Sequence, residues 1–118
     1  MFRSVICLIL AGFVALPAFA QGKGYSALVA KVKKEVVRDF KDPDGAKFRD
    51  LALYQTQTGK TGDLVCGQVN GKNSYGAFVG YRNFVYADGL IAIEEADGSG
   101  TYPVLSEAIC HKRLRSIE

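Results

Sequence analysis

Residues 64–86 constrain the fold of this chain more than any other part of the sequence. The stretch contains two segments with the composition of β-strands, residues 64–70 and 77–86. A run rich in Gly, Asn and Ser, residues 71–76, lies between them and has the composition of a turn. The first segment also contains Cys66. We therefore expect an antiparallel pair of strands here, tied by its cysteine to another part of the chain.

The first 20 residues have the features of a signal peptide. Arg3 supplies a positive charge, residues 5–14 are almost wholly apolar, and small residues flank Phe19 at the −3 and −1 positions of a cleavage site after Ala20. The apolar run is shorter than the roughly 20 residues that span a bilayer. The alternative, a retained N-terminal anchor, is less favoured. Cleavage predicts a single domain, residues 21–118, that is periplasmic or secreted and has no integral membrane segment.

The charge of the mature chain excludes little by itself. The formal net charge falls from +3 to +2 on cleavage, because Arg3 is the charged residue that leaves. A balance this mild neither requires nor forbids nucleic acid, but a periplasmic address argues against a nucleic-acid partner.

The cysteines predict one disulfide. Cys7 leaves with the signal peptide, so Cys66 and Cys110 remain and most simply pair in an exported domain. Such a bond stabilises the fold by roughly 4 kcal/mol through the entropy of the unfolded chain. A free buried pair and intermolecular bridges are the alternatives. A metal site with His111 is not expected, since there is no CxxC spacing and no fourth ligand is evident.

Helical periodicity appears near both ends of the mature chain. Apolar residues recur at helical spacing over residues 26–41, and residues 104–114 fit a second helix that follows Pro103. We also expect a short helical turn at residues 43–47, after Asp42. The face of the first helix opposite its apolar stripe is basic, which fits either a solvated surface or an anionic partner. Its cations are Lys31, Lys34, Arg38 and Lys41.

The remaining segments predict strands, and the fold class is α+β. We expect an N-terminal helix, an antiparallel meander of about four strands, a C-terminal helix and one disulfide, with both helices on the same face of the sheet. In the first strand Phe48 is expected to share a side with Ala52, opposite Leu51. The Asp88-Gly89 pair predicts a tight turn before the last strand. The expected strands are residues 48–56, 64–70, 77–86 and 90–94.

Two short motifs resemble those of a known group of proteins. The sequence DPDGAKFR at residues 42–49 and VCGQVNGKNSYG at residues 65–76 are similar to the "DPxSAKFR" and "VCGxVNxKNxxGGY" elements of small, uncharacterised, exported proteins of Gram-negative bacteria. The chain departs from this pattern at Gly45 and Ala77, where the group has Ser and Gly. The resemblance implies a bacterial periplasmic domain and assigns no catalytic residue.

Enzyme motifs are weak in this sequence. His111 is the single histidine, it lies among basic residues, and no GxSxG nucleophile motif accompanies it. The GKTG sequence at residues 59–62 lacks the earlier glycine of a phosphate-binding loop, so it predicts a turn. A small envelope hydrolase would have to use His111 or a pair of carboxylates. The candidate carboxylates are Asp42, Asp44, Asp50, Glu94 and Glu95.

The turn at residues 71–76 and the strand after it carry the best binding candidates. Hydrogen-bonding side chains surround glycines there, and glycine lets a backbone approach a ligand closely. The alternative is that the asparagines only hydrogen-bond their own backbone in a turn. We therefore expect a non-enzymatic binding or inhibitor-type module without a cofactor, which recognises a protein or cell-envelope glycan through the surface of residues 70–86. A structural accessory of an envelope complex is a further alternative. The candidate binding residues are Asn70, Lys72, Asn73, Ser74, Tyr75, Tyr81 and Arg82.

Overall fold

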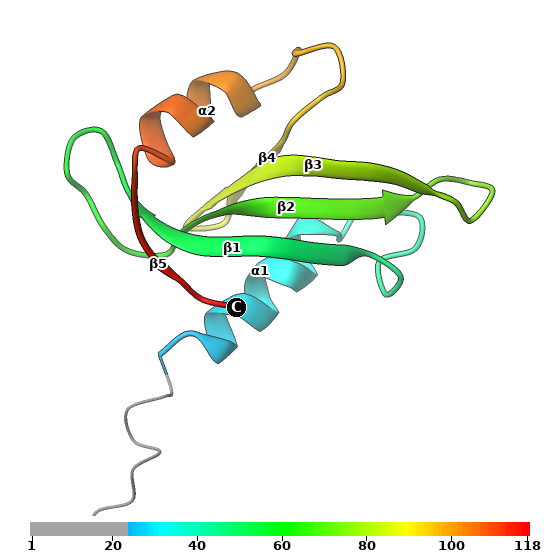
Figure 1. Ribbon diagram of the computed structural model, residues 1–118, viewed down its shortest axis with the longest axis horizontal. Helices are drawn as coiled ribbons and strands as arrows, with labels where there is room; N and C mark the ends of the chain where they lie inside the picture. Colours follow the sequence, from blue (N-terminus) through cyan, green and yellow to red (C-terminus); the bar gives the residue numbers. More distant parts are fainter. Residues whose placement is uncertain (1–23) are drawn as a thin grey trace, which may run out of the picture.

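A computed structural model describes residues 24–118 of the chain (Figure 1). The predicted signal peptide, its cleavage after Ala20 and Cys7 lie outside the described residues. The described part contains two helices and a five-stranded antiparallel sheet, which confirms the α+β class and adds one strand to the expected four. In chain order the elements are α1 (Ser26–Val36), β1 (Lys47–Gln55), β2 (Leu64–Lys72), β3 (Phe78–Ala87), β4 (Leu90–Ile93), α2 (Tyr102–Ile109) and β5 (Lys112–Ser116).

The strands β1 to β4 form the expected meander, and β5 adds to its outer edge. The sheet order is β4-β3-β2-β1-β5, so that β2 is central and β5 pairs antiparallel with β1 from Ala52 to Gln55. The expected C-terminal helix over residues 104–114 is wrong in its second half. α2 ends at Ile109, and the next residue, Cys110, leaves the helical conformation with ψ 45°. The residues of β5 then form backbone hydrogen bonds with the open edge of β1. The helical periodicity of residues 104–114 gives no information about that edge.

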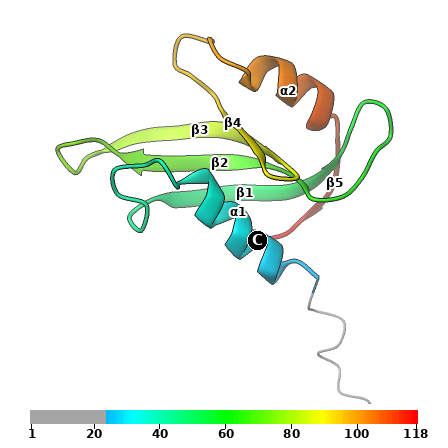
Figure 2. The same ribbon diagram turned by 180° about the vertical axis from the view of Figure 1, so that it is seen from behind.

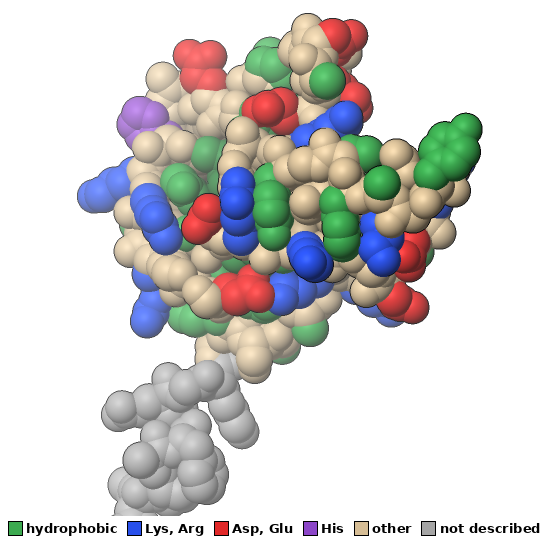
Figure 3. All heavy atoms as spheres, turned by 45° about the vertical axis from the view of Figure 1, so that its right-hand side comes forward, with side chains coloured by type: hydrophobic (Ala, Val, Ile, Leu, Met, Phe, Trp, Pro, Cys, Tyr) green, Lys and Arg blue, Asp and Glu red, His purple; other side chains and the backbone are tan. Residues whose placement is uncertain are grey.

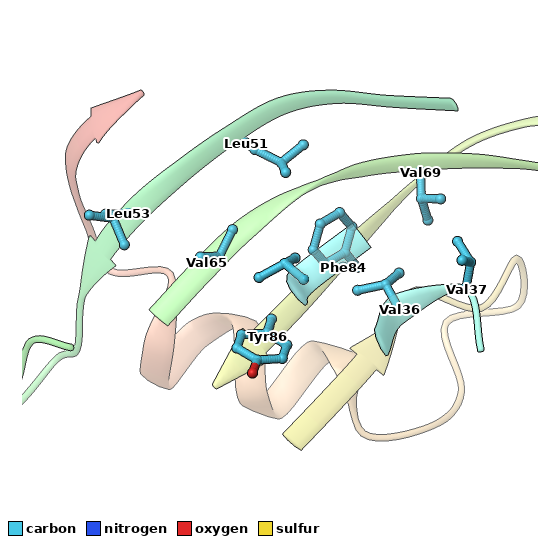
Figure 4. Packing of buried hydrophobic residues seen from close by; sticks show 9 residues of the cluster. Val36, Val37, Leu51, Leu53, Val65, Val69, Phe84 and Tyr86 are labelled. Atoms are coloured by element: carbon cyan, nitrogen blue, oxygen red, sulfur yellow. The ribbon is translucent and has the colours of Figure 1, made fainter. Parts of the chain in front are cut away.

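α1 covers one face of the sheet and closes the main core (Figure 4). Val32 is fully buried and Val36 nearly so, and both pack against side chains from β1, β2 and β3. The helix ends at Val36 rather than near Lys41, because residues 37–40 continue as turns in which the Phe40 N–H donates to the Val37 carbonyl. The buried cluster consists of Val32, Val36, Val37, Leu51, Leu53, Val65, Val69, Phe84 and Tyr86.

A β-bulge at Asp50 explains why the alternation of β1 is imperfect. Asp50 has a φ of +58°, and the register between β1 and β2 shifts between Arg49 and Ala52. An extra residue in one strand moves every later side chain to the other face. Phe48 therefore lies on the core side with Leu51, against the expectation, and its ring meets Phe84 edge-on at 5.9 Å between centroids.

α2 lies on the face of the sheet opposite to α1, so the expectation that both helices share a face is wrong. Figures 1 and 2 show α1 on one side of the sheet and α2 on the other. The physical reason is the disulfide between Cys66 and Cys110, which is confirmed. Val65 points into the core under α1, so its neighbour Cys66 points to the other face and brings the end of α2 there.

Two turns decide how the strands enter the sheet. Residues 43–46 form a single turn, in which the Ala46 N–H donates to the Pro43 carbonyl at 3.3 Å and the Gly45 N–H donates to the Asp42 carboxylate (Oδ1) at 3.1 Å. The helical turn expected over residues 43–47 does not form, because Lys47 already belongs to β1. The predicted tight turn after β3 is confirmed: Asp88 and Gly89 both have positive φ, 48° and 96°. That geometry is typical of a type I′ hairpin, which places β4 directly beside β3.

Candidate functional site

The end of the β2–β3 hairpin, residues 70–82, holds all seven candidate binding residues and is called the hairpin end below. Its turn is built by asparagine. The Asn73 side-chain oxygen accepts the N–H groups of Tyr75 at 2.9 Å and Ala77 at 3.1 Å. The Asn70 side-chain oxygen accepts the Gly80 N–H at 3.0 Å. These two asparagines therefore shape the backbone, as the turn interpretation predicts.

Exposed apolar side chains gather at the hairpin end. Tyr75 is 95% exposed, and Val79 and Phe78 keep 52% and 39% of their surface. The ammonium groups of Lys47 and Lys72 lie 4.7 and 5.2 Å from the centre of the Phe78 ring. Figure 3 shows this arrangement as hydrophobic side chains flanked by Lys and Arg, with a hydrophobic side chain projecting at the end. Aromatic side chains such as these are enriched in protein interfaces.

A cavity of about 390 Å³ lies at the base of the hairpin end, on the face that α1 covers. We call it the hairpin pocket. Its apolar lining comes from β2, the end of β4 and the turn after α1, where Phe40 packs so closely on Gly71 that a Cβ there would lie 2.9 Å from the ring. It is lined by Phe40, Lys41, Val69, Gly71, Lys72, Asn73, Ser74, Val79, Gly80, Arg82, Ile93 and Glu95.

Three cations surround the hairpin pocket, and their partners are exposed. The Lys72 ammonium lies 3.8 Å from Asp42 Oδ2, and Arg82 Nη1 lies 3.7 Å from Glu95 Oε2. Lys41 donates a hydrogen bond to the Ser74 hydroxyl. Exposed pairs of this length contribute at most about 1 kcal/mol, so a ligand carboxylate can replace either partner at little cost.

The opposite face of the sheet carries a ladder of polar side chains that the sequence did not predict as a unit. Arg49 donates to Gln68, Gln68 donates to Asn83, and Asn83 donates to Glu94, at 2.6, 3.0 and 2.9 Å. The ladder runs from β1 across β2 and β3 to Glu94, the residue that follows β4. The Arg49 guanidinium also stacks on the ring of Tyr81 at 3.7 Å. These residues lie far apart in the sequence, and only the pairing of the strands brings their side chains together.

The candidate residues therefore divide between three places. Lys72, Asn73, Ser74 and Arg82 line the hairpin pocket. Tyr81 lies on the opposite face, beneath Arg49, and Tyr75 stands at the exposed tip. Asn70 lies at none of these three places, and its side chain holds the backbone of β3 at Gly80. Lys41 and Glu95 also line the pocket and were not among the binding candidates, because they come from segments whose proximity to the hairpin depends on the tertiary fold.

A second cavity, of about 430 Å³, lies beside the disulfide on the α2 face. Tyr54, Tyr102 and Arg113 line it together with Cys66 and Cys110. Burial raises the pKa of Tyr102 above its ordinary value of 10.0, although a hydrogen bond with Ser106 opposes the shift. The cavity is polar and its charged groups are half-exposed or exposed, so it resembles a solvated gap between α2 and the sheet.

The residues proposed for a hydrolase have other contacts. His111 is exposed between α2 and β5. Glu94 ends the polar ladder, and Glu95 pairs with Arg82. Residues 59–62 lie in the loop between β1 and β2, as the turn prediction states, and the Thr56 N–H donates to the Lys60 carbonyl within that loop. Within residues 24–118 no group of three or more His, Cys, Asp and Glu side chains converges as a metal site would require.

Comparisons with known proteins add no relative. None of the helices in the described part of the chain is long and apolar enough to cross a membrane. The resemblance to exported Gram-negative proteins stays a prediction. No protein-family model, curated protein or solved structure matches this chain.

Proposed function

We propose that this chain is a non-enzymatic binding module of the bacterial periplasm or the secreted fraction, and that it recognises its partner through the hairpin pocket and the exposed tip beside it. The disulfide is compatible with an extracellular or periplasmic protein. The predicted signal peptide and the resemblance of residues 42–49 and 65–76 to exported proteins support the periplasmic address.

One observation carries the proposal: the hairpin pocket combines an apolar lining with three cations, next to a tyrosine that is 95% exposed. A tyrosine as exposed as Tyr75 contributes little to packing inside the domain, and aromatic side chains are the residues that anchor protein interfaces. The pocket also lies at the largest group of exposed apolar side chains on one element. A protein partner fits this chemistry better than a glycan, because the pocket lining is more apolar than polar.

The two alternative functions have less support. A hydrolase would need His111 or a carboxylate pair in one cleft, and the contacts of these residues assign them other tasks. An accessory role through the basic side of α1 would use Lys31, Lys34 and Arg38. Those side chains are exposed, as expected for a solvated helix face. The test below therefore uses a substitution on this face as its control.

The test is a capture experiment with the oxidised mature protein, periplasmic extract and purified peptidoglycan. A Lys72→Ala/Tyr75→Ala variant removes one pocket cation and the tip. A Lys31→Ala/Val104→Ala variant removes one cation and one exposed apolar side chain elsewhere, since Val104 is 72% exposed. Both variants should keep a melting temperature close to the parent's, because Tyr75, Lys31 and Val104 are exposed and the half-buried Lys72 loses only an ion pair with Asp42 worth at most about 1 kcal/mol.

We expect the parent and the control variant to capture the same partner, identified by mass spectrometry, and the hairpin variant to lose it. Capture of peptidoglycan in the same pattern would identify a glycan ligand of the same site. Equal capture by all three proteins would overturn the proposal and move the site away from the hairpin end.

A further inference from the structure

The cavity of about 430 Å³ beside the disulfide differs in chemistry and in place from the hairpin pocket. It lies on the α2 face of the sheet, whereas the hairpin pocket lies on the α1 face (Figures 1 and 2), and no residue lines both. Its volume is within the range of small-molecule sites. The side chains that make it polar are Asp50, Tyr54, Gln68, Asn83, Tyr102 and Arg113.

The polar ladder fixes the orientation of the two amide side chains in this cavity. Arg49 donates to the amide oxygen of Gln68 at 2.6 Å. At the other end of the ladder, Glu94 accepts from the amide nitrogen of Asn83 at 2.9 Å. An arginine can only donate and an ionised carboxylate can only accept. Neither amide can therefore flip without losing its bond to a charged group.

Each of the two amide groups keeps unused hydrogen-bonding capacity. An amide NH₂ group has two donors, and the nitrogens of Gln68 and Asn83 each use one of them in the ladder. Within residues 24–118 neither nitrogen donates to a second partner. Both side chains are half-buried at the cavity. A ligand oxygen that accepts these N–H groups would replace water and leave the ladder intact.

Asp50 brings a carboxylate to the same cavity through an uncommon backbone conformation. Its φ is +58°, and the other non-glycine residue of residues 24–118 with positive φ is Asp88, whose hairpin turn requires it. Asp50 lies inside β1, and its bulge places the Arg49 and Asp50 side chains on the same face. Bulges are frequent beside functional sites, where they redirect a side chain. Asp50 Oδ2 lies 4.0 Å from Arg49 Nε, both groups are exposed, and the carboxylate is therefore free to accept from a ligand.

We propose that the cavity beside the disulfide binds a neutral saccharide. Sugar hydroxyl groups both donate and accept, so they match a lining in which amide N–H groups donate and a carboxylate accepts. The half-buried rings of Tyr54 and Tyr102 offer apolar surface to the C–H face of a sugar ring. The formal charges of Asp50 and Arg113 cancel, which favours an uncharged ligand. The site is separate from the hairpin pocket, so this inference goes beyond the proposed function.

The test follows the binding of small oligosaccharides to the oxidised mature protein by NMR. The neutral probes are maltotetraose, cellotetraose and chitotetraose, and the charged probes are the tetramers of galacturonic acid and of glucosamine. Each probe is added up to about 10 mM, which detects a Kd of roughly 1 mM. The signals followed are the side-chain NH₂ groups of Gln68 and Asn83 and the backbone amides of the cavity and of the hairpin end.

Two variants remove groups of the cavity, and a third is the control. Asp50→Gly removes the carboxylate and places at this position a residue that tolerates positive φ, so its melting temperature should stay close to the parent's. Asn83→Ala removes one amide group of the ladder. Lys72→Ala/Tyr75→Ala changes the hairpin end and leaves the cavity unchanged.

We expect at least one neutral probe to shift the NH₂ signals of Gln68 and Asn83. Asp50→Gly and Asn83→Ala should each weaken its binding at least about tenfold, as the loss of a hydrogen bond in a formed site implies. The control variant should bind the probe as the parent does. If Asn83→Ala does not fold, Asp50→Gly decides the question.

Four results would overturn the inference. The first is that no neutral probe shifts the NH₂ signals, as expected of a cavity that holds only water. The second is equal binding by the parent and Asp50→Gly. The third is tighter binding of a charged probe than of every neutral one. The fourth is loss of binding in the control variant, which would place the saccharide at the hairpin end. The capture experiment decides the proposed function separately in each case.

Discussion

Removal of the disulfide is the perturbation with the largest expected effect on this fold. The double substitution Cys66→Ala/Cys110→Ala opens a loop with a sequence separation of 44 residues. The entropy gained by the unfolded chain lowers the free energy of unfolding by about 4 kcal/mol at 25 °C. Alanine is the suitable replacement because Cys66 is 7% exposed, and a serine hydroxyl there would need a partner.

The structure also predicts which elements lose stability first when the disulfide is removed. α2 has no buried residue. Besides the disulfide it is held by the Gln57 N–H, which donates to the Ala108 carbonyl at 2.9 Å. All five residues of β5 are exposed. We therefore expect α2 and β5 to detach at lower free energy than the core under α1, because no residue of either element belongs to the buried cluster of that core.

Urea denaturation followed by circular dichroism measures the global effect. A loss of about 4 kcal/mol should lower the urea midpoint by roughly 2–4 M for a domain of this size. Amide hydrogen exchange of the variant should show the protection of β5 and α2 falling before that of β2 and β3. The reduced parent protein is the matched control and should behave like the variant. A loss below about 1 kcal/mol, or uniform loss of protection across all elements, would refute the reasoning.

Two core substitutions test the packing. Tyr86→Phe should leave the free energy of unfolding unchanged or raise it by up to about 1 kcal/mol, because the Tyr86 hydroxyl is buried and has no hydrogen-bond partner among the described residues. Thermal and urea unfolding check this, and a clear loss of stability would mean that the hydroxyl does have a partner. Gly67→Val should lower the free energy of unfolding by about 1–3 kcal/mol, because even a Cβ at this position lies 3.2 Å from the side chains of Leu51 and Phe84. Unchanged stability in the same assay would show that these side chains yield without strain.

Short-range patterns in the sequence are enough to predict strands β1 to β4 and the disulfide. Strands β1 to β4 begin and end within two residues of their expected bounds, because alternating apolar residues and turn residues such as Asp88-Gly89 act over short distances. The pairing of Cys66 with Cys110 followed from the count of cysteines that remain after export. From the sequence, Asn70 and Asn73 could either bind a ligand or hydrogen-bond their own backbone. In the structure both side chains accept backbone N–H groups of the hairpin.

The faces and edges that the elements share follow from long-range packing, which short-range patterns in the sequence do not contain. The bulge at Asp50 reverses the side of Phe48, because one extra residue in a strand inverts the alternation, and no residue in the sequence announces it. The strand β5 exists because the edge of β1 has free hydrogen-bonding groups, which a helical pattern in residues 104–114 cannot reveal. The hairpin pocket depends on Phe40 and Ile93, which lie far apart in the chain and meet only when α1 and β4 pack on the sheet.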